Sequence, residues 1–177
     1  MKLLTILSNG FEDLECIGTL ALCRRAGIQA DIYTLHDTQA IGKYNTPLTS
    51  VDTLTNADIS TYDALFIPGG PHYEELENSE VVKNVITYFM EHGKVVAAIC
   101  AAPTILGHMG HLKNKHYTCY TEMNEDFGGT FHDEHSVTDG NLVTGRAAAG
   151  TINFAFALIE VLGGKELADA IKEEVYY

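Results

Sequence analysis

Residues 94–106 read KVVAAICAAPTIL, and this stretch decides the fold that we expect for the chain. It opens on an apolar run, residues 95–99, of the kind that forms a buried strand in a parallel sheet. The segment that follows Cys100, residues 101–103 (AAP), suits the first turn of a helix, where the missing N–H of proline costs nothing. The pattern predicts a strand, a sharp turn and a helix, with Cys100 at the turn.

A thiol at this turn faces the unpaired N–H groups and the positive dipole end of the following helix. Both features favour the thiolate, so we expect the pKa of Cys100 to fall from about 8.5 toward roughly 3.5–7.5. Small neighbours such as Ala101 leave the sulfur accessible. The alternative is a buried and inert cysteine, which is the commoner fate of a free thiol.

The composition is that of a soluble globular protein, with 177 residues, 46% apolar and 20% charged, and it predicts one domain over residues 1–177. The formal net charge of −13 argues against nucleic acid and anionic membrane surfaces as partners. The chain shows neither a signal peptide nor a run of about 20 apolar residues, so we expect a cytoplasmic protein. Its four cysteines have no paired spacing and are expected to be free thiols.

Apolar runs predict four buried strands: 2–7, 28–35, 62–68 and 95–99. Helical periodicity and capping residues predict further helices: 11–25, 79–91, 150–162 and 165–174. Strands that alternate with helices imply right-handed βαβ units. We therefore predict a flavodoxin-like α/β fold, a three-layer α/β/α sandwich around a doubly wound, mostly parallel sheet.

Smaller elements and buried faces are predicted as well. A polar stretch predicts a loop with a small hairpin (36–53), residues 117–120 predict a further strand, and Asp139-Gly140 predicts a hairpin turn. The buried stripe of the first helix is expected to contain Leu14, Ile17 and Ala21, flanked by Cys16, Leu20 and Cys23. The buried face of the helix over 79–91 is expected to contain Val81, Val82, Val85, Ile86 and Phe89.

Three of the predicted strands end in residues suited to a binding site. In doubly wound sheets, ligands sit outside the carboxyl ends of the strands. Asn9-Gly10, Gly69-Gly70 and Cys100 all follow predicted strands at that edge. This convergence favours a functional role for the thiol.

Four motifs occur in order along nearly the whole chain: NGFEDLE (9–15), FIPGG (66–70), AAICAAP (97–103) and TGRAAAGT (144–151). In these motifs the sequence resembles the ThiJ/PfpI superfamily, and within it the DJ-one branch with its bacterial relatives. The resemblance implies the same α/β fold, a reactive cysteine and a homodimer without an obligatory cofactor. Since the family holds several chemistries, it indicates the activity much less strongly than the fold.

The resemblance also implies roles for individual residues. Glu15 matches the acidic partner of the cysteine, and a buried carboxyl beside a thiolate should stay protonated and donate to the sulfur. The alternative is a solvated carboxylate. The backbone N–H groups of Gly69, Gly70 and Ala101 would act as an oxyanion hole, although the glycines can also be a plain turn. Arg146 resembles the family's arginine near the thiol and the dimer interface, the alternative being a surface salt bridge.

Histidine is where the sequence departs from the family. The peptidase branches place a histidine directly after the nucleophile, whereas this chain has Ala101, which weighs against a Cys-His peptidase. In the DJ-one branch an assisting histidine follows the elbow helix, and the matching position here is Tyr120, a poor base at neutral pH. His72, His132 or His135 could substitute, or each could be a solvated loop residue. The histidine clusters lack a third ligand at set spacing, so no metal site is expected.

The leading function implied by the resemblance is glyoxalase- or deglycase-like chemistry on a small reactive carbonyl. Cys100 would attack the aldehyde of a 2-oxoaldehyde, Glu15 would shuttle the proton, and hydrolysis would release a hydroxy acid. The alternative is a redox-responsive stress protein or chaperone, in which an oxidant converts Cys100 to a sulfinate held by Glu15. An intracellular peptidase or amidase is the third possibility, weakened by Ala101.

Overall fold

The computed structural model describes residues 1–49 and 51–177, and its centre is a seven-stranded sheet. The strand order is β10-β11-β7-β6-β1-β2-β5, with β10–β11 antiparallel and the other pairs parallel. Its strands are β1 (Lys2–Leu7), β2 (Gln29–Thr34), β5 (Asp52–Thr53), β6 (Ala64–Ile67), β7 (Val95–Ile99), β10 (Ser136–Asp139) and β11 (Leu142–Gly145). The prediction of a flavodoxin-like, mostly parallel sheet is confirmed.

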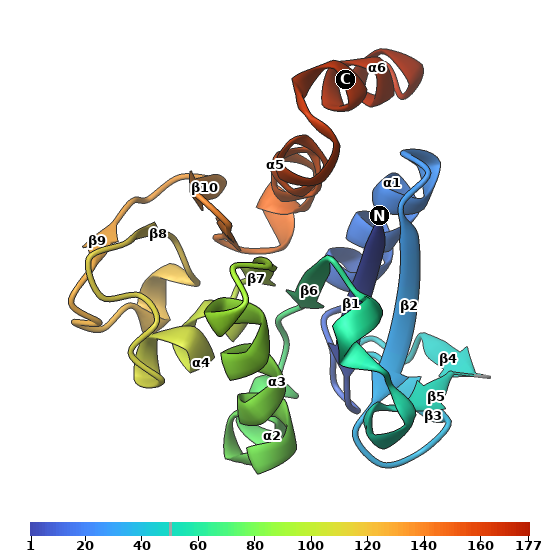
Figure 1. The fold of residues 1–177 in the computed structure, drawn as a ribbon, viewed down its shortest axis with the longest axis vertical. Helices are drawn as coiled ribbons and strands as arrows, with labels where there is room; N and C mark the ends of the chain where they lie inside the picture. Colours follow the sequence, from blue (N-terminus) through green and yellow to red (C-terminus); the bar gives the residue numbers. More distant parts are fainter. Residues whose placement is uncertain (50) are drawn as a thin grey trace.

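The described helices are α1 (Asp13–Arg25), α2 (Tyr73–Asn78), α3 (Glu80–Glu91), α4 (Ala102–His108), α5 (Thr151–Gly163) and α6 (Lys165–Glu174). Helices α1, α5 and α6 cover one face of the sheet, and α2, α3 and α4 lie on the other (Figure 1). Alternation along each strand divides the core between these faces, so that neighbouring Leu3 and Leu4 of β1 belong to different clusters. None of the helices in the described part of the chain is both long and apolar enough to span a bilayer.

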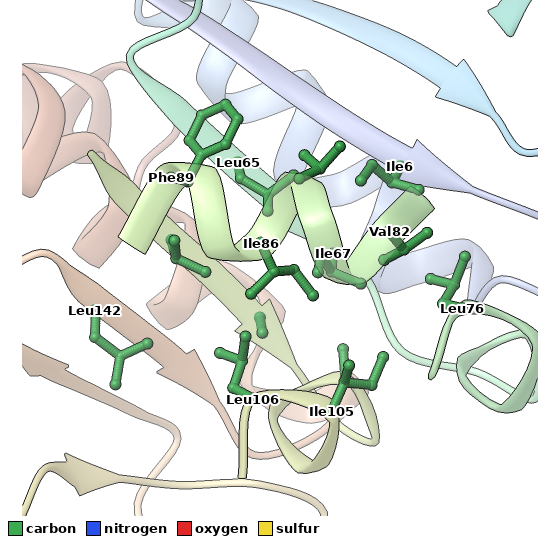
Figure 2. Packing of buried hydrophobic residues seen from close by; sticks show 14 of the residues in the cluster. Ile6, Leu65, Ile67, Leu76, Val82, Ile86, Phe89, Ile105, Leu106 and Leu142 are labelled. Atoms are coloured by element: carbon green, nitrogen blue, oxygen red, sulfur yellow. The ribbon is translucent and has the colours of Figure 1, made fainter. Parts of the chain in front are cut away.

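Figure 2 shows the core on the α3 side of the sheet. Val82, Ile86 and Phe89 of α3 are fully buried and pack with Leu65 and Ile67 of β6. These residues recur at the three- and four-residue spacing of one helix face. Val81, which was predicted to share this face, is instead 45% exposed because it lies one residue outside the repeat.

The buried face of α1 differs from the prediction. Leu14 and Ile17, expected in the core, are 55% and 38% exposed, and Ala21 is exposed beside them. The residues that face the sheet are Glu15, Cys16, Thr19, Leu20 and Cys23. Apolar residues surround nearly the whole circumference of α1, so periodicity alone could not select the buried side.

The smaller elements agree only in part with their predictions. Both hairpins are confirmed: β3 (Gln39–Ile41) pairs with β4 (Pro47–Thr49), and β10 pairs with β11. The strand predicted over 117–120 is wrong in extent, because β8 (His116–Tyr117) ends early and pairs only with β9 (Thr130–Phe131). The backbone beyond it is held by irregular contacts instead, among them the Tyr120 N–H on the Cys100 carbonyl. Helix α2 was not predicted, because Leu76 is its one buried residue.

Candidate active site

Cys100 lies at a strained elbow between β7 and α4. Its φ of +64° is in the left-handed region, which costs a residue with a side chain of the order of 1–3 kcal/mol. Backbone hydrogen bonds fix the conformation on both sides: the Cys100 N–H donates to the Gly145 carbonyl at 2.9 Å, and the Cys100 carbonyl accepts from the Tyr120 N–H at 2.7 Å. The predicted turn from strand to helix is therefore present, and it holds the thiol at the carboxyl edge of the sheet.

Glu15 reaches this thiol from the first turn of α1. The residue is completely buried, and its Oε2 accepts a hydrogen bond from the Gly69 N–H at 2.9 Å. Its other oxygen, Oε1, is buried without a partner of regular hydrogen-bond geometry. The Cys100 thiol lies beside the carboxyl and interacts with it as a weak hydrogen-bonding neighbour. The acidic residue predicted to pair with the cysteine thus does lie next to it.

The close approach of the two groups depends on Gly69. A Cβ atom at Gly69 would lie 2.5 Å from the Cβ of Cys100 and 2.6 Å from Oε2 of Glu15. The Gly69 N–H is occupied by Glu15, so its predicted role as an oxyanion donor is wrong. The N–H groups of Gly70 and Ala101 are the ones that interact with the sulfur, and they remain available to an oxygen attached to it.

The electrostatics of Cys100 contradict the expected acidic thiol. Burial raises its pKa to about 12, the charge and hydrogen bond of Glu15 raise it further, and the amides of Ala101 and Gly70 oppose the shift. Helix α4 has only seven residues and its dipole cannot outweigh burial next to a carboxyl group.

Burial also raises the pKa of Glu15 to about 7, followed by the charge of Glu12, while Cys100, the Gly69 amide and Lys43 oppose the shift. Glu15 therefore stays protonated well above the ordinary pKa of a glutamic acid, as predicted. Two negative charges on the adjacent Glu15 carboxyl and Cys100 sulfur would repel each other strongly. The pair therefore carries a single negative charge over a wide pH range above about 7. A proton that moves from sulfur to carboxylate within this pair generates the thiolate.

A cavity of about 340 Å³ opens above the thiol. Its walls combine apolar and charged side chains: Glu12, Lys43, Gly70, Pro71, Tyr73, Glu74, Cys100, Ala101, Tyr120 and Met123. Tyr120 was predicted to lie near the thiol, and it does. Six lining residues were not predicted as site residues: Glu12, Lys43, Pro71, Tyr73, Glu74 and Met123. Some of them lie within or close to the recognised motifs, but nothing in the sequence marked Lys43 and Met123.

His72 was a candidate base, and the structure rules it out. The side chain is 2% exposed and does not line the cavity. Its Nδ1 accepts from the Ser8 N–H at 3.1 Å, so Nε2 carries the proton donated to the Pro68 carbonyl at 2.9 Å. Burial lowers its pKa to about 4, and His72 is a neutral brace between β1 and β6.

The side chains of Arg146 and the loop histidines do not line the cavity at the thiol. Arg146 forms an ion pair with Asp133 at 2.8 Å and lines a different cavity with His135. His132 contacts His116, with 2.7 Å between Nε2 and Nδ1. Arg146 directly follows Gly145, whose carbonyl accepts from the Cys100 N–H, but its side chain does not line the cavity at the thiol, and its predicted role there stays a prediction. Within residues 1–49 and 51–177, no group of three or more His, Cys, Asp and Glu side chains is arranged to hold a metal.

The chain is thus a doubly wound α/β protein with a cysteine at a strained turn between a strand and a helix, and with a buried carboxyl group beside the thiol. A model described as the DJ-1/PfpI family matches residues 1–161. The chain belongs to the DJ-1/PfpI family.

Three known proteins illustrate the relationship. Protein DJ-1 homolog A of Arabidopsis thaliana is 32% identical over 172 residues, and the match spans 93% of this chain but 44% of that protein. A protein named deglycase from Thermococcus kodakarensis is 31% identical over 149 residues, covering 82% of this chain and 90% of that protein. The solved structure of oxidized Toxoplasma gondii DJ-1 superimposes with a TM-score of 0.91 at 25% identity, covering 99% of this chain and 98% of that one.

Two of the buried titratable groups, Glu15 and His72, predict opposite effects of pH on stability. The pKa of Glu15 is raised in the native state, so between pH 4.5 and about 7 the native state binds more protons than the unfolded state. The contribution of Glu15 to the free energy of unfolding is therefore lost as pH rises through this window. His72 has a lowered pKa, so its contribution is lost as pH falls from 6.5 to about 4. Each contribution is on the order of 3 kcal/mol at about 1.4 kcal/mol per pKa unit, and the two largely cancel between pH 4.5 and 6.5.

Urea unfolding of the wild type, Glu15→Gln and His72→Gln at several pH values between 4 and 8 checks this. Relative to the wild type, the free energy of unfolding of Glu15→Gln should increase as pH rises through 4.5–7, because the variant lacks the penalty of a buried carboxylate. That of His72→Gln should increase as pH falls through 6.5–4. Difference curves that are flat for both variants would contradict the assignment.

Proposed function

We propose that this protein is a cysteine-dependent enzyme that converts a 2-oxoaldehyde such as methylglyoxal into a 2-hydroxy acid without a cofactor. The observation that carries the proposal is the contact between the Glu15 carboxyl and the Cys100 thiol beside a cavity of about 340 Å³. The cavity suits a small molecule, and the pair supplies a nucleophile and a proton carrier. The relative named deglycase supports chemistry on carbonyl adducts.

In the first step, the sulfur of Cys100 forms a bond to the aldehyde carbon, and Glu15 gives its proton to the aldehyde oxygen. The product is a hemithioacetal, whose developing oxyanion can be met by the N–H groups of Gly70 and Ala101. The unpartnered Oε1 of Glu15 is the atom that we assign to proton transfer.

In the second step, Glu15 removes the proton from the former aldehyde carbon while the ketone oxygen takes up a proton, which gives an enediol. Glu15 then returns its proton to the neighbouring carbon, and the hydroxyl group on the first carbon loses its proton, which replaces the one taken up by the ketone oxygen, to become the thioester carbonyl. The first carbon is thereby oxidised to a thioester and the ketone is reduced to an alcohol, so no external oxidant or reductant is consumed. Water then cleaves the thioester, which releases the hydroxy acid and restores the thiol.

In this proposal, Tyr120 limits the rate of turnover. It lines the cavity beside Cys100, at the position where the resemblance places an assisting histidine. A phenol donates a hydrogen bond but is a poor base at neutral pH, whereas general acid–base help is worth about 10²–10⁴ in rate. Since His72 is buried and Arg146 lies elsewhere, Glu15 carries the proton transfers alone.

Lactate formation from methylglyoxal without glutathione tests the proposal. We expect slow wild-type turnover, none in Cys100→Ser, and a loss of about 10²–10⁴ in Glu15→Gln, because the amide cannot shuttle a proton. Tyr120→His should raise turnover by up to ~10², while Tyr120→Phe serves as the matched control without a base. Turnover that survives in Cys100→Ser would contradict the proposal.

A second function is favoured by the same donors. Peroxide can oxidise Cys100 in two steps to a sulfinate, each peroxide delivering one oxygen atom and leaving as water. The sulfinate oxygens would accept from Gly70, Ala101 and protonated Glu15, and the solved Toxoplasma relative is described as oxidized. Absence of turnover in every variant, with Cys100 the first of the four cysteines to gain oxygen, would favour this redox-sensing function over the enzyme.

We also propose that the partner of the chain is a second copy, seated on the outward face of α1. Leu14, Ile17 and Ile152 are 55%, 38% and 48% exposed. They belong to two helices that pack against each other, α1 and the start of α5, since a Cβ atom at Gly18 would be 3.0 Å from the side chain of Thr151. Exposed apolar patches of this kind mark interaction sites, and the family resemblance implies a homodimer.

Sedimentation equilibrium checks the dimer. Leu14→Glu combined with Ile17→Glu should shift the protein to monomer, because each carboxylate would be desolvated at the interface. Val81→Glu is the control, since Val81 is similarly exposed on α3, away from this face. A dimer that survives the α1 substitutions, or a wild-type monomer, would contradict the proposal.

A further inference from the structure

His108 ends α4 and lies between two acidic side chains from separate parts of the chain. Its Nδ1 contacts the carboxylate of Glu77, which belongs to α2. Its Nε2 is 3.3 Å from Oε2 of Glu125, which follows the short 3-10 helix Thr121–Met123. The ring also packs edge-on against Phe127, with 5.3 Å between the ring centroids. His108 thus bridges α2 and the segment 120–127.

The charge of the ring follows from its two partners. An ionised carboxylate can only accept, so both ring nitrogens must carry a proton, and this requires the imidazolium form. The carboxylates that face the ring are Glu77 from α2 and Glu125 from the opposite segment, while Phe127 adds an apolar edge. In agreement, the hydrogen bond that the ring donates to Glu77, and then the one that it donates to Glu125, raise the pKa of His108 against its partial burial. A neutral ring would leave one lone pair facing a carboxylate and lose that contact.

The two bridged elements both contribute walls to the cavity at Cys100. Helix α2 contributes Tyr73 and Glu74, and the other segment contributes Tyr120 and Met123. That segment is held to the rest of the protein independently of His108, because the Tyr117 hydroxyl donates to Asn124 Oδ1 at 2.8 Å. Loss of the His108 bridge would therefore change the spacing between the walls without releasing the segment.

We propose that His108 is a positioning residue that, as an imidazolium, clasps the two walls of the cavity together and relaxes them when it loses its proton. The clasp would make access to Cys100 pH-dependent: narrow when His108 is charged and wider when it is neutral. The inference rests on the proposed role of Cys100 as the group that reacts with molecules in this cavity. It concerns the width of the cavity rather than the chemistry of the thiol.

The test compares two thiol reagents, a bulky maleimide and small iodoacetamide, by mass spectrometry of the Cys100 peptide across the titration of His108. Both reagents attack the thiolate, so the ratio of their rates cancels the fraction of thiolate and reports access. In the wild type, the bulky-to-small ratio should rise severalfold with pH, with its midpoint at the pKa of His108 measured by NMR.

Two variants should remove this step in opposite directions. His108→Gln cannot bond both carboxylates, so its ratio should be high at every pH. Glu125→Gln should give a low ratio at every pH, because an amide can accept from the charged ring and donate to the neutral ring. His36→Gln is the matched control: His36 contacts Glu75 of α2 at 2.9 Å through one nitrogen and should keep the wild-type step.

Several results would overturn the inference. A wild-type ratio that does not change with pH contradicts the clasp, as does an unchanged step in His108→Gln. If the pH-dependent change in the ratio is lost in His36→Gln, it reflects any histidine contact with α2 and is not specific to His108. If the reagents alkylate Cys100 but the protein forms no lactate from methylglyoxal, the proposed function is contradicted. The alkylation ratio then still decides for or against the clasp. If neither reagent modifies Cys100, both the function and the clasp are contradicted.

Discussion

The contact between the Glu15 carboxyl and the Cys100 thiol is the constraint on which the rest of the site depends. To bring a carboxyl group to the sulfur, α1 turns Glu15 and Thr19 inward and leaves apolar side chains such as Leu14 exposed. The strand β6 must be followed by Gly69, because a side chain there would overlap both members of the pair. The elbow must hold Cys100 at positive φ, and the resulting strain is offset by backbone hydrogen bonds on both sides of the residue.

Burial then decides what the pair can do. Burial raises the pKa of both groups, so each of them alone would resist ionisation. The thiol therefore does not simply lose its proton to solvent at neutral pH. Together the two groups hold one negative charge, and the thiolate arises when the proton moves to the carboxyl group. Nucleophile and proton carrier are thus made in the same event, with the amides of Gly70 and Ala101 ready to stabilise an oxyanion or a sulfinate. For this reason we propose carbonyl chemistry as the function and controlled oxidation of Cys100 as its alternative.

Most of the fold could be predicted from the sequence because buried parallel strands are apolar runs, and β1, β6 and β7 are such runs. The buried side of α1 could not be predicted, because apolar residues lie all around that helix. In addition, the polar residue Glu15 occupies a buried position beside Cys100. The elbow cysteine was marked by its local pattern, whereas Glu15 was found through family resemblance. Position in the chain does not fix the direction of a side chain, so the sequence could not show that His72 is buried or that Arg146 pairs with Asp133. The thiol pKa was misjudged because neither the shortness of α4 nor the depth of burial is visible in the sequence.

The most direct test of the shared proton is the rate of Cys100 alkylation by iodoacetamide as a function of pH, in the wild type and in Glu15→Gln. If the pair loses one proton near pH 7 and then divides a single charge between sulfur and carboxyl, the wild-type rate should rise to about that pH and reach a plateau. In Glu15→Gln the plateau should vanish, and the rate should keep rising about tenfold per pH unit toward the pKa of an isolated, partly buried thiol. A wild-type rate that rises through pH 7 without a plateau, in the same way as the variant, would contradict the account.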